Sequence, residues 1–172
     1  MDQLIDPQFI TEFRKQIVTA FADVPAPNAL LINHQCDECL ELQQAFEGLS
    51  WRDIPSALLK DNYSNLSLFS AEAFHAFIPA YLIHSVENWD GEDMVSEFTA
   101  YSLLPDDLAD QDEGHGNWWK LKLSLFNDEQ FALLLEYLGF VERTDKYFDR
   151  SLMKRGRERL IKLRDAAENN IG

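Results

Sequence analysis

Apolar residues recur three and four positions apart over much of the chain, and this spacing places them on one face of an α-helix. The pattern predicts helices at about residues 7–22, 36–48, 71–88, 92–104, 128–138 and 146–168, with shorter helical turns between residues 51 and 63. Gly48 and Gly139 follow two of these segments, where glycine commonly ends a helix in a left-handed conformation. The sequence therefore predicts a mainly α fold, with about six helices in a single compact domain over residues 1–172.

Two short stretches of the sequence are nearly identical. Residues 66–74 read LSLFSAEAF and residues 123–131 read LSLFNDEQF, with six identical positions. In each copy a polar residue, Ser70 or Asn127, is a suitable N-cap, and the phenylalanines around it are spaced to form a hydrophobic staple. The staple pairs would be Phe69 with Phe74 and Phe126 with Phe131. The repeat reflects either two uses of one favourable helix start or the duplication of a helical unit.

One segment departs from the helical spacing. Residues 118–126 read WWKLKLSLF, in which leucines alternate with polar residues, and this period of two is typical of a β-strand. Its partner would be residues 29–32, ALLI, which would give the domain one short strand pair. The polar and glycine-containing residues 106–116, DDLADQDEGHG, are expected to form the loop that leads into it.

Composition places the chain among globular proteins. It has 172 residues, of which 46% are hydrophobic, with 7 glycines and 6 prolines. A chain of this length buries about 70% of the surface that it exposes when unfolded, so it needs neither a disulfide nor a metal to fold. The first residues, MDQLIDPQFITEF, lack the apolar core of a secretory signal, and no apolar run reaches the roughly 18 residues of a membrane span. We therefore expect a cytoplasmic protein that does not enter a membrane.

The net charge of −15 is unevenly distributed along the chain. No lysine or arginine lies between Lys60 and Lys120, whereas nine of the 15 basic residues lie after residue 140. The C-terminal helix predicted at about residues 146–168 is therefore basic and amphipathic, and its bases are expected to pair with acids of the same protein. The overall negative field repels phosphates, which argues against binding to nucleic acids or anionic membranes.

Acidic residues are concentrated between Glu87 and Glu113, a stretch with ten carboxylates and no base. A dense surface of one sign speeds association with an oppositely charged partner and excludes others. The sequence thus predicts a non-catalytic binding protein for a basic protein partner, such as an inhibitor, an immunity protein that neutralises a toxin, or a DNA mimic. The predicted contact residues are Asp106, Asp107, Asp110, Asp112, Glu113, His115, Trp118 and Trp119.

The sharpest candidate for chemistry is a histidine followed by two cysteines: His34, Cys36 and Cys39. Imidazole and thiolates bind zinc or iron, and two cysteines at this spacing also occur as redox pairs. A structural zinc site requires a fourth ligand that the sequence does not identify, and Cys39 shares a helix face with Leu42 and Phe46, as a small core residue would. We therefore expect the motif to begin a helix and to join the core, with no metal or other cofactor. The alternative is a metal- or thiol-dependent enzyme that uses these three residues.

Three stretches resemble a family of bacterial domains to which no function has been assigned. They are WRDIP at residues 51–55, SAEAF and IPAYL within residues 70–82, and NDEQF and YL within residues 127–138. The resemblance implies a helical fold in a bacterial cytoplasm. It transfers no catalytic residue, because the family has none assigned.

Overall fold

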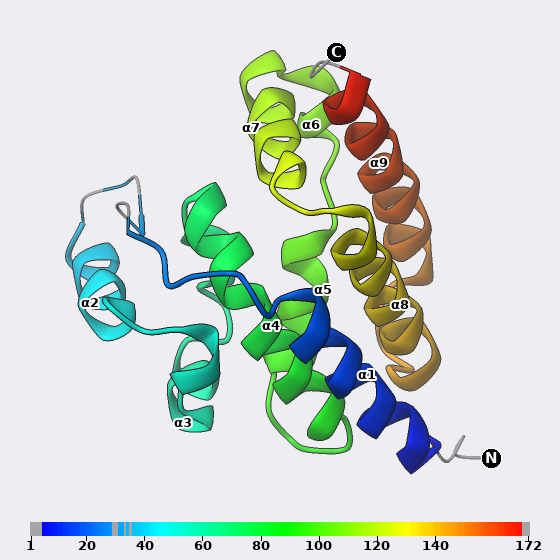
Figure 1. Ribbon diagram of the computed structural model, residues 1–172. Helices are drawn as coiled ribbons and strands as arrows, with labels where there is room; N and C mark the ends of the chain where they lie inside the picture. Colours follow the sequence, from blue (N-terminus) through cyan, green and yellow to red (C-terminus); the bar gives the residue numbers. More distant parts are fainter. Residues whose placement is uncertain (1–4, 29–30, 33, 35, 170–172) are drawn as a thin grey trace.

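The computed structural model of the protein describes residues 5–28, 31, 32, 34 and 36–169. In this part of the chain all regular secondary structure is helical, and it forms one compact domain, as predicted (Figure 1). The α-helices are α1 Pro7–Ala20, α2 Asp37–Phe46, α3 Ser56–Asp61, α4 Ala71–Glu87, α5 Val95–Leu103, α6 Leu108–Gln111, α7 Glu113–Ser124, α8 Asp128–Thr144 and α9 Arg150–Asn169, and η1 Trp51–Asp53 and η2 Leu66–Leu68 are 3-10 helices. None of the helices in the described residues is long and apolar enough to cross a membrane.

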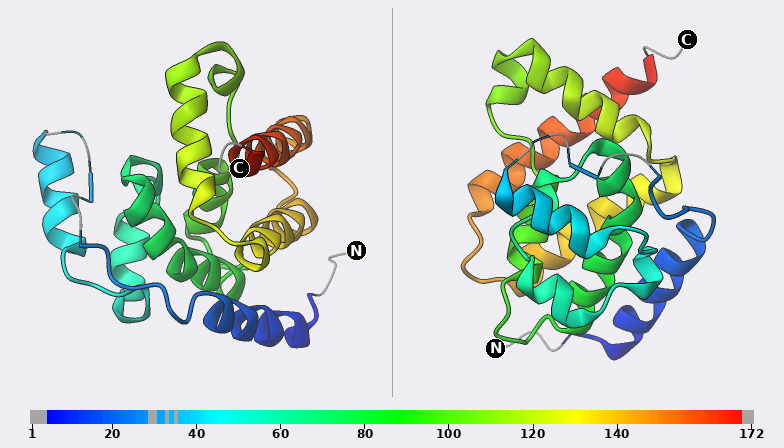
Figure 2. Two further views of the ribbon diagram at one scale, coloured as in Figure 1. Left: turned by 45° about the horizontal axis from the view of Figure 1, so that its top comes forward. Right: turned by 90° about the vertical axis from the view of Figure 1, so that its left-hand side faces the viewer.

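Helix α4 lies at the centre of the domain. Helices α2 and α3 lie on one side of it and α8 and α9 on the other, while α1, α5 and α7 pack directly against it (Figure 1, Figure 2). From Ala71 to Val86 nearly every α4 side chain is buried, so the helix lacks the polar face of a surface helix.

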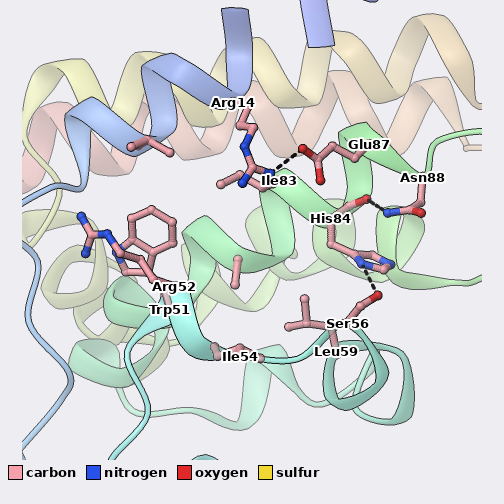
Figure 3. Close-up of a pocket in the computed structure, with 12 residues that line it drawn as sticks. Arg14, Trp51, Arg52, Ile54, Ser56, Leu59, Ile83, His84, Glu87 and Asn88 are labelled. Atoms are coloured by element: carbon pink, nitrogen blue, oxygen red, sulfur yellow. Dashed lines mark hydrogen bonds and ion pairs between the residues drawn. The ribbon is translucent and has the colours of Figure 1, made fainter. Parts of the chain in front are cut away.

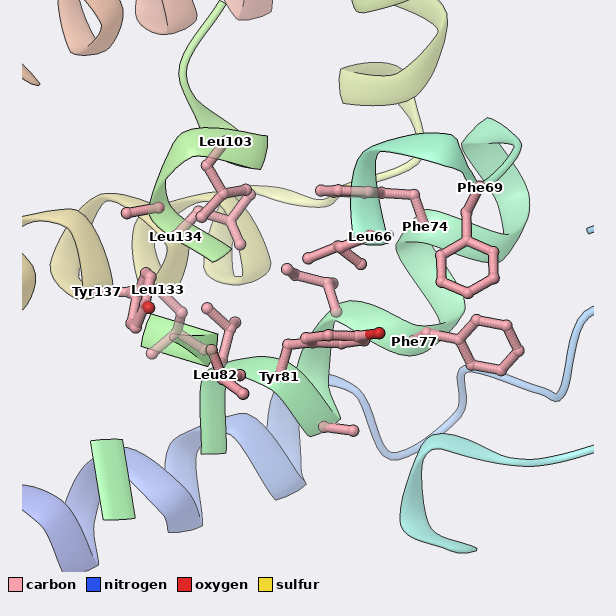
Figure 4. Close-up of a cluster of buried hydrophobic side chains, with 14 of the residues drawn as sticks. Leu66, Phe69, Phe74, Phe77, Tyr81, Leu82, Leu103, Leu133, Leu134 and Tyr137 are labelled. Carbon is pink, nitrogen blue, oxygen red and sulfur yellow. The ribbon is translucent and has the colours of Figure 1, made fainter. Parts of the chain in front are cut away.

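Large side chains from several helices fill the space around α4 (Figure 4). Tyr81 of α4 and Tyr137 of α8 are fully buried, and each hydroxyl donates to a backbone carbonyl, of Asn62 at 3.3 Å and of Ser96 at 2.8 Å. Burial raises the pKa of Tyr137 to about 12, so its hydroxyl stays protonated. Each buried side chain of this size contributes about 1.5–3 kcal/mol through removal from water.

The two similar stretches begin α4 and α8 with the predicted N-caps. Ser70 Oγ accepts the N–H of Ala73 at 3.2 Å, and Asn127 forms a reciprocal capping box with Gln130. The predicted staples remain a prediction, since the ring contacts of the described residues pair each preceding phenylalanine with another ring. Phe69 contacts Phe77 at 5.2 Å between ring centroids, and among the described ring contacts Phe126 meets Phe74 edge-on at 6.4 Å. The second copy thus contacts the first through Phe126 and Phe74.

Gln130 connects three helices through its side chain. Besides capping α8, its Oε1 accepts a hydrogen bond from His75 Nε2 of α4 at 3.0 Å, and its Nε2 donates to the carbonyl of Ala20 at 2.9 Å. Ala20 ends α1, and the last carbonyls of a helix have no partner within it. Gln130 is buried, and burial lowers the pKa of His75, so this His–Gln contact is a neutral hydrogen bond.

The region expected to form a loop and a strand is helical instead. Asp112 Oδ1 accepts the N–H of His115 at 2.7 Å and so begins α7, which continues to Ser124. The leucine alternation was misleading because Lys122, taken for a solvent-facing residue, is only 1% exposed, whereas Leu121 is 58% exposed. These exposures fit a helix that buries an unexpected lysine.

The expected partner strand is also not formed at Leu31 and Ile32, the two of its residues that the structure describes. Leu31 donates its N–H to the Gln43 side chain at 3.0 Å, and its carbonyl accepts the N–H of Ser70 at 2.6 Å. These backbone groups therefore bond to helical residues rather than to a strand. The other two residues, Ala29 and Leu30, lie outside the described residues.

Helix α8 continues past Gly139, which was expected to end it. Phe140 and Val141 are both fully buried, so their packing outweighs the cost of about 1 kcal/mol that glycine adds to a helix interior. Gly48, by contrast, has a φ of 75°, the left-handed conformation predicted for the residue that follows α2.

Helix α9 is the predicted basic helix, but it begins at Arg150 rather than near residue 146. Asp149 sets this start, because its Oδ1 accepts the N–H groups of Ser151 and Leu152 at 2.8 and 3.1 Å. The helix packs against α7 and α8. At Gly156 it comes so close to Leu104 that an added Cβ would lie 2.8 Å from the Leu104 Cβ.

We expect Gly156→Ala to lower the free energy of unfolding by about 1–3 kcal/mol, because the extra methyl group overpacks the contact with Leu104. Gly139→Ala is the matched control, since a Cβ there meets only the flexible end of Arg143 at 3.5 Å. It should raise the free energy of unfolding by about 0.5–1 kcal/mol through helix propensity. Urea denaturation measures both changes, and a loss of stability in Gly139→Ala would contradict its place inside α8.

Candidate functional site

Most acids of the acidic stretch at residues 87–113 lie in two groups at the two ends of α5, with Glu97 within the helix. Glu87, Asp90, Glu92 and Asp93 lie around the connection from α4 to α5, whereas the acids of residues 106–113 lie beyond the other end of α5 (Figure 1). The 9 residues of α5 separate the two groups by about 13 Å at 1.5 Å per residue. The predicted contact acids are therefore a local cluster before and within α6 and at the start of α7.

Several acids of this cluster already have partners within the protein. Arg159 of α9 donates from Nη2 to Asp107 and from Nε to Asp110, at 2.7 Å each. The hydrogen bond from Arg159 lowers the pKa of Asp110 below its usual value. Asp112 caps α7, while Glu113, in the first turn of that helix, is exposed. The basic helix thus pairs with acids of its own protein at this point.

Four of the predicted contact residues come together with Lys122 around a hollow of about 220 Å³, which we call the aromatic hollow. His115 Nε2 lies 3.2 Å from Asp106 Oδ1, and the His115 ring stacks on Trp118 with centroids 6.1 Å apart. Trp118 is half-buried and Trp119 is buried. The sequence analysis grouped these four residues because they are close in sequence. In the structure they line the same hollow.

Lys122 also lines the aromatic hollow, and the sequence did not suggest it as a contact residue. Its Nζ lies 3.4 Å from the Phe74 ring centroid, 4.1 Å from that of Trp119 and 4.8 Å from that of Trp118. It donates to the carbonyl of Ser102 at 3.1 Å. Complete burial lowers the pKa of Lys122 well below its usual value, because the charged amine is removed from water.

The histidine and the two cysteines also come together. Cys36 is the N-cap of α2, where its Sγ accepts the N–H of Cys39 at 3.3 Å, and Cys39 is buried in the core. The Cys39 Sγ lies 3.6 Å from Nδ1 of His34. The hydrogen bond with Cys36 raises the pKa of the Cys39 thiol, and burial raises it further. The motif begins a helix, and the same turn gathers all three candidate ligands.

A cleft of about 420 Å³ lies between α1, η1, α3 and α4 (Figure 3). Arg14 of α1 forms an ion pair with Glu87 of α4 there. Arg52 stacks over the Trp51 ring at 4.3 Å and donates to the carbonyl of Ala22 at 2.9 Å. The cleft therefore offers apolar and aromatic surface beside two guanidinium groups, a combination that suits a small ligand with an anionic group.

A hydrogen-bonded chain of serine, histidine and aspartate lies at this cleft. His84 Nδ1 is 3.2 Å from Ser56 Oγ, and His84 Nε2 is 3.0 Å from Asp93 Oδ2 (Figure 3 shows the first contact). With the Nε2 proton directed at the carboxylate, Nδ1 is left to accept the serine hydroxyl. His84 is buried and Ser56 is exposed. The sequence could not indicate this chain, because its members come from α3, α4 and the connection before α5, without a shared motif.

The lowered pKa of Lys122 gives the protein a defined pH dependence. Between the pKa of the folded state and the usual value of 10.5, the unfolded chain binds more protons, so the free energy of unfolding rises with pH. We expect the wild type to gain stability relative to Lys122→Met over this interval, by at most about 1.4 kcal/mol per pH unit. Urea unfolding of both proteins at increasing pH measures the difference. An identical pH dependence of the two would contradict the lowered pKa.

Comparison with known proteins identifies the family of this chain. A model described as "Family of unknown function (DUF6714)" matches residues 11–155, which include all three of the resembling stretches. No curated protein and no solved structure shows significant similarity to the chain. The match covers well over half of the 172 residues. The chain therefore belongs to the family of unknown function DUF6714.

Proposed function

We propose that this protein is a non-catalytic binding protein that recognises a basic protein partner through the face around the aromatic hollow. The observation that carries the proposal is a half-buried Trp118 beside a concave place whose rim holds the Asp106 carboxylate, with its side chain 60% exposed. Tryptophans of this kind are common centres of protein interfaces. A lysine or arginine of the partner can stack on the indole and pair with the carboxylate.

The contacts within the protein divide the predicted residues into two groups. Asp107 and Asp110 are engaged by Arg159, whose side chain is only 14% exposed, so they hold α6 against α9. Asp106 Oδ1 accepts the N–H of Leu108 and lies near His115, but the Asp106 side chain is 60% exposed, and Glu113 is exposed too. The first group supports the surface, and the second, with Trp118 and His115, is proposed to make contact.

The net charge of −15 supports the same proposal, because it attracts a basic partner from a distance and repels phosphates. Inhibitors, immunity proteins that neutralise a toxin, and DNA mimics all belong to this class of acidic binding protein. In the proposed complex, the negative charge attracts the partner over a long range, and Trp118 contacts it at short range. Association should therefore be fast at low salt and slow at high salt.

Affinity capture from an extract of the native host, with wild-type protein and two variants, tests this function. Glu113→Lys and Trp118→Ala should each lower recovery of a basic protein, and recovery should fall steeply with salt. Glu41→Lys is the matched control, because it makes the same charge change on an exposed residue of α2, on the other side of α4. Equal losses with Glu113→Lys and Glu41→Lys would show that only net charge matters. Recovery of no basic protein at low salt would refute the proposal.

A second candidate function is hydrolysis of a small ester with an anionic group, and the Ser56–His84–Asp93 chain favours it. Ser56 Oγ would attack the acyl carbon, and its proton would pass to His84 Nδ1 and then to the leaving oxygen. Water would then release the acyl group by the same route and restore the serine. Asp93 would stabilise the imidazolium that forms in each step.

A fluorophosphonate probe tests the enzymatic alternative directly. Attack by Ser56 Oγ displaces fluoride and leaves a stable phosphonyl adduct, which mass spectrometry locates. The enzymatic alternative predicts one adduct on Ser56, its loss in Ser56→Ala, and slower labelling in Asp93→Asn, while Ser67→Ala, which removes another exposed serine, labels normally. If folded wild-type protein forms no adduct, Ser56 is not an activated nucleophile, and the histidine contacts are structural.

A further inference from the structure

His34, Cys36 and Cys39 present three metal-binding atoms to one point in space. The ring nitrogen and the two sulfurs all lie within 4.8 Å of one another, and His34 Nδ1 and Cys39 Sγ are 3.6 Å apart. Neutral imidazole and thiolates together form a donor set that selects zinc over calcium or magnesium. No carboxylate is needed to complete this set.

The spacing of these atoms is close to what a zinc ion imposes. With bonds of about 2.3 Å to sulfur and 2.0–2.1 Å to nitrogen, a tetrahedral site holds its ligand atoms about 3.5–3.8 Å apart. The separation of His34 Nδ1 and Cys39 Sγ already falls in this range. For any pair in the cluster, the 4.8 Å limit leaves at most about 1 Å of adjustment, which side-chain rotation can supply.

The local fold holds the donors in place before any ion binds. Cys36 is the N-cap of α2 and Cys39 lies in its first turn, a spacing that puts both sulfurs on one side of the helix start. The segment before them is attached independently, since Leu31 bonds to Gln43 of α2 and to Ser70 at the start of α4. The convergence therefore follows from two separate attachments of the chain.

We propose that His34, Cys36 and Cys39 bind one zinc ion, with a fourth coordination position open to solvent. No other histidine, cysteine, aspartate or glutamate of the described residues joins the cluster. His34 is exposed and Cys36 half-buried, so the open position faces the surface, where water or a donor atom from another molecule can bind. Three protein ligands with one open position are the arrangement of catalytic rather than structural zinc sites.

This zinc site is independent of the proposed binding function. It lies at α2, on the opposite side of α4 from α9, and shares no residue with the aromatic hollow (Figure 1). The ion would join the segment before α2 to the first turn of that helix. A ten-residue helix is marginally stable alone, so the ion should slow the local opening of α2.

Cobalt titration of the reduced, metal-free full chain tests the site, because tetrahedral thiolate-bound Co²⁺ has strong visible and charge-transfer absorption whereas Zn²⁺ has none. We expect one equivalent of Co²⁺ to bind and Zn²⁺ to displace it. Cys36→Ser should weaken the thiolate bands, and His34→Ala should weaken binding at least tenfold with the fold unchanged by circular dichroism. His115→Ala is the matched control for loss of a histidine outside the cluster, and it should bind as the wild type does.

Amide hydrogen exchange gives a second measurement that does not depend on colour. One equivalent of Zn²⁺ should slow exchange over residues 36–46 and leave α8 unchanged. Absence of charge-transfer absorption in the wild type, or identical titrations of wild type and His34→Ala, would overturn the proposal. So would two thiols that react with a thiol reagent equally fast with and without Zn²⁺.

Discussion

Helix α4 has almost no polar face, and the need to cover it on every side determines how the rest of the chain is arranged. Its two histidines have partners inside the domain, which matters because a buried polar group without a hydrogen bond costs about 1–3 kcal/mol. His75 is paired with Gln130, and His84 with Ser56 and Asp93. The hydrogen bonds that satisfy His84 in the core therefore also bring the serine, histidine and aspartate together at the cleft.

Charge is balanced inside this domain more than its net value suggests. Basic residues near the C-terminus form ion pairs with acids of earlier segments of the chain. Arg159 meets Asp107 and Asp110, and Arg164 donates to the carbonyl of Leu123 and to Asp128. Helix α9 thus acts as an internal counter-charge for α6 and the start of α8. Of the acids around α6 and the start of α7, this pairing leaves Asp106 and Glu113 for the proposed partner.

Local signals in the sequence predicted most helices correctly, since caps such as Ser70, Asn127 and Gly48 act within a few residues of themselves. The errors came where tertiary packing outweighed the local pattern. Lys122 is buried against aromatic rings that come partly from another helix, and Gly139 stays helical because its neighbours are in the core. The candidate sites also differ in whether local sequence or tertiary packing brings their residues together. The motif of His34, Cys36 and Cys39 is visible in the sequence, whereas the Ser56–His84–Asp93 chain exists only after three distant segments meet.

The contacts of Gln130 have a consequence for the order in which the protein can form on the ribosome. The carbonyl at the end of α1 receives its hydrogen bond from a residue 110 positions later in the chain. During synthesis at about 5–20 residues per second, α1 and the half-buried His75 are made several seconds before that partner. In nascent chains that end before α8, the end of α1 therefore lacks this hydrogen bond. Helix α1 is thus made first in this domain, but its C-terminal carbonyl receives this hydrogen bond only after Gln130 has been made.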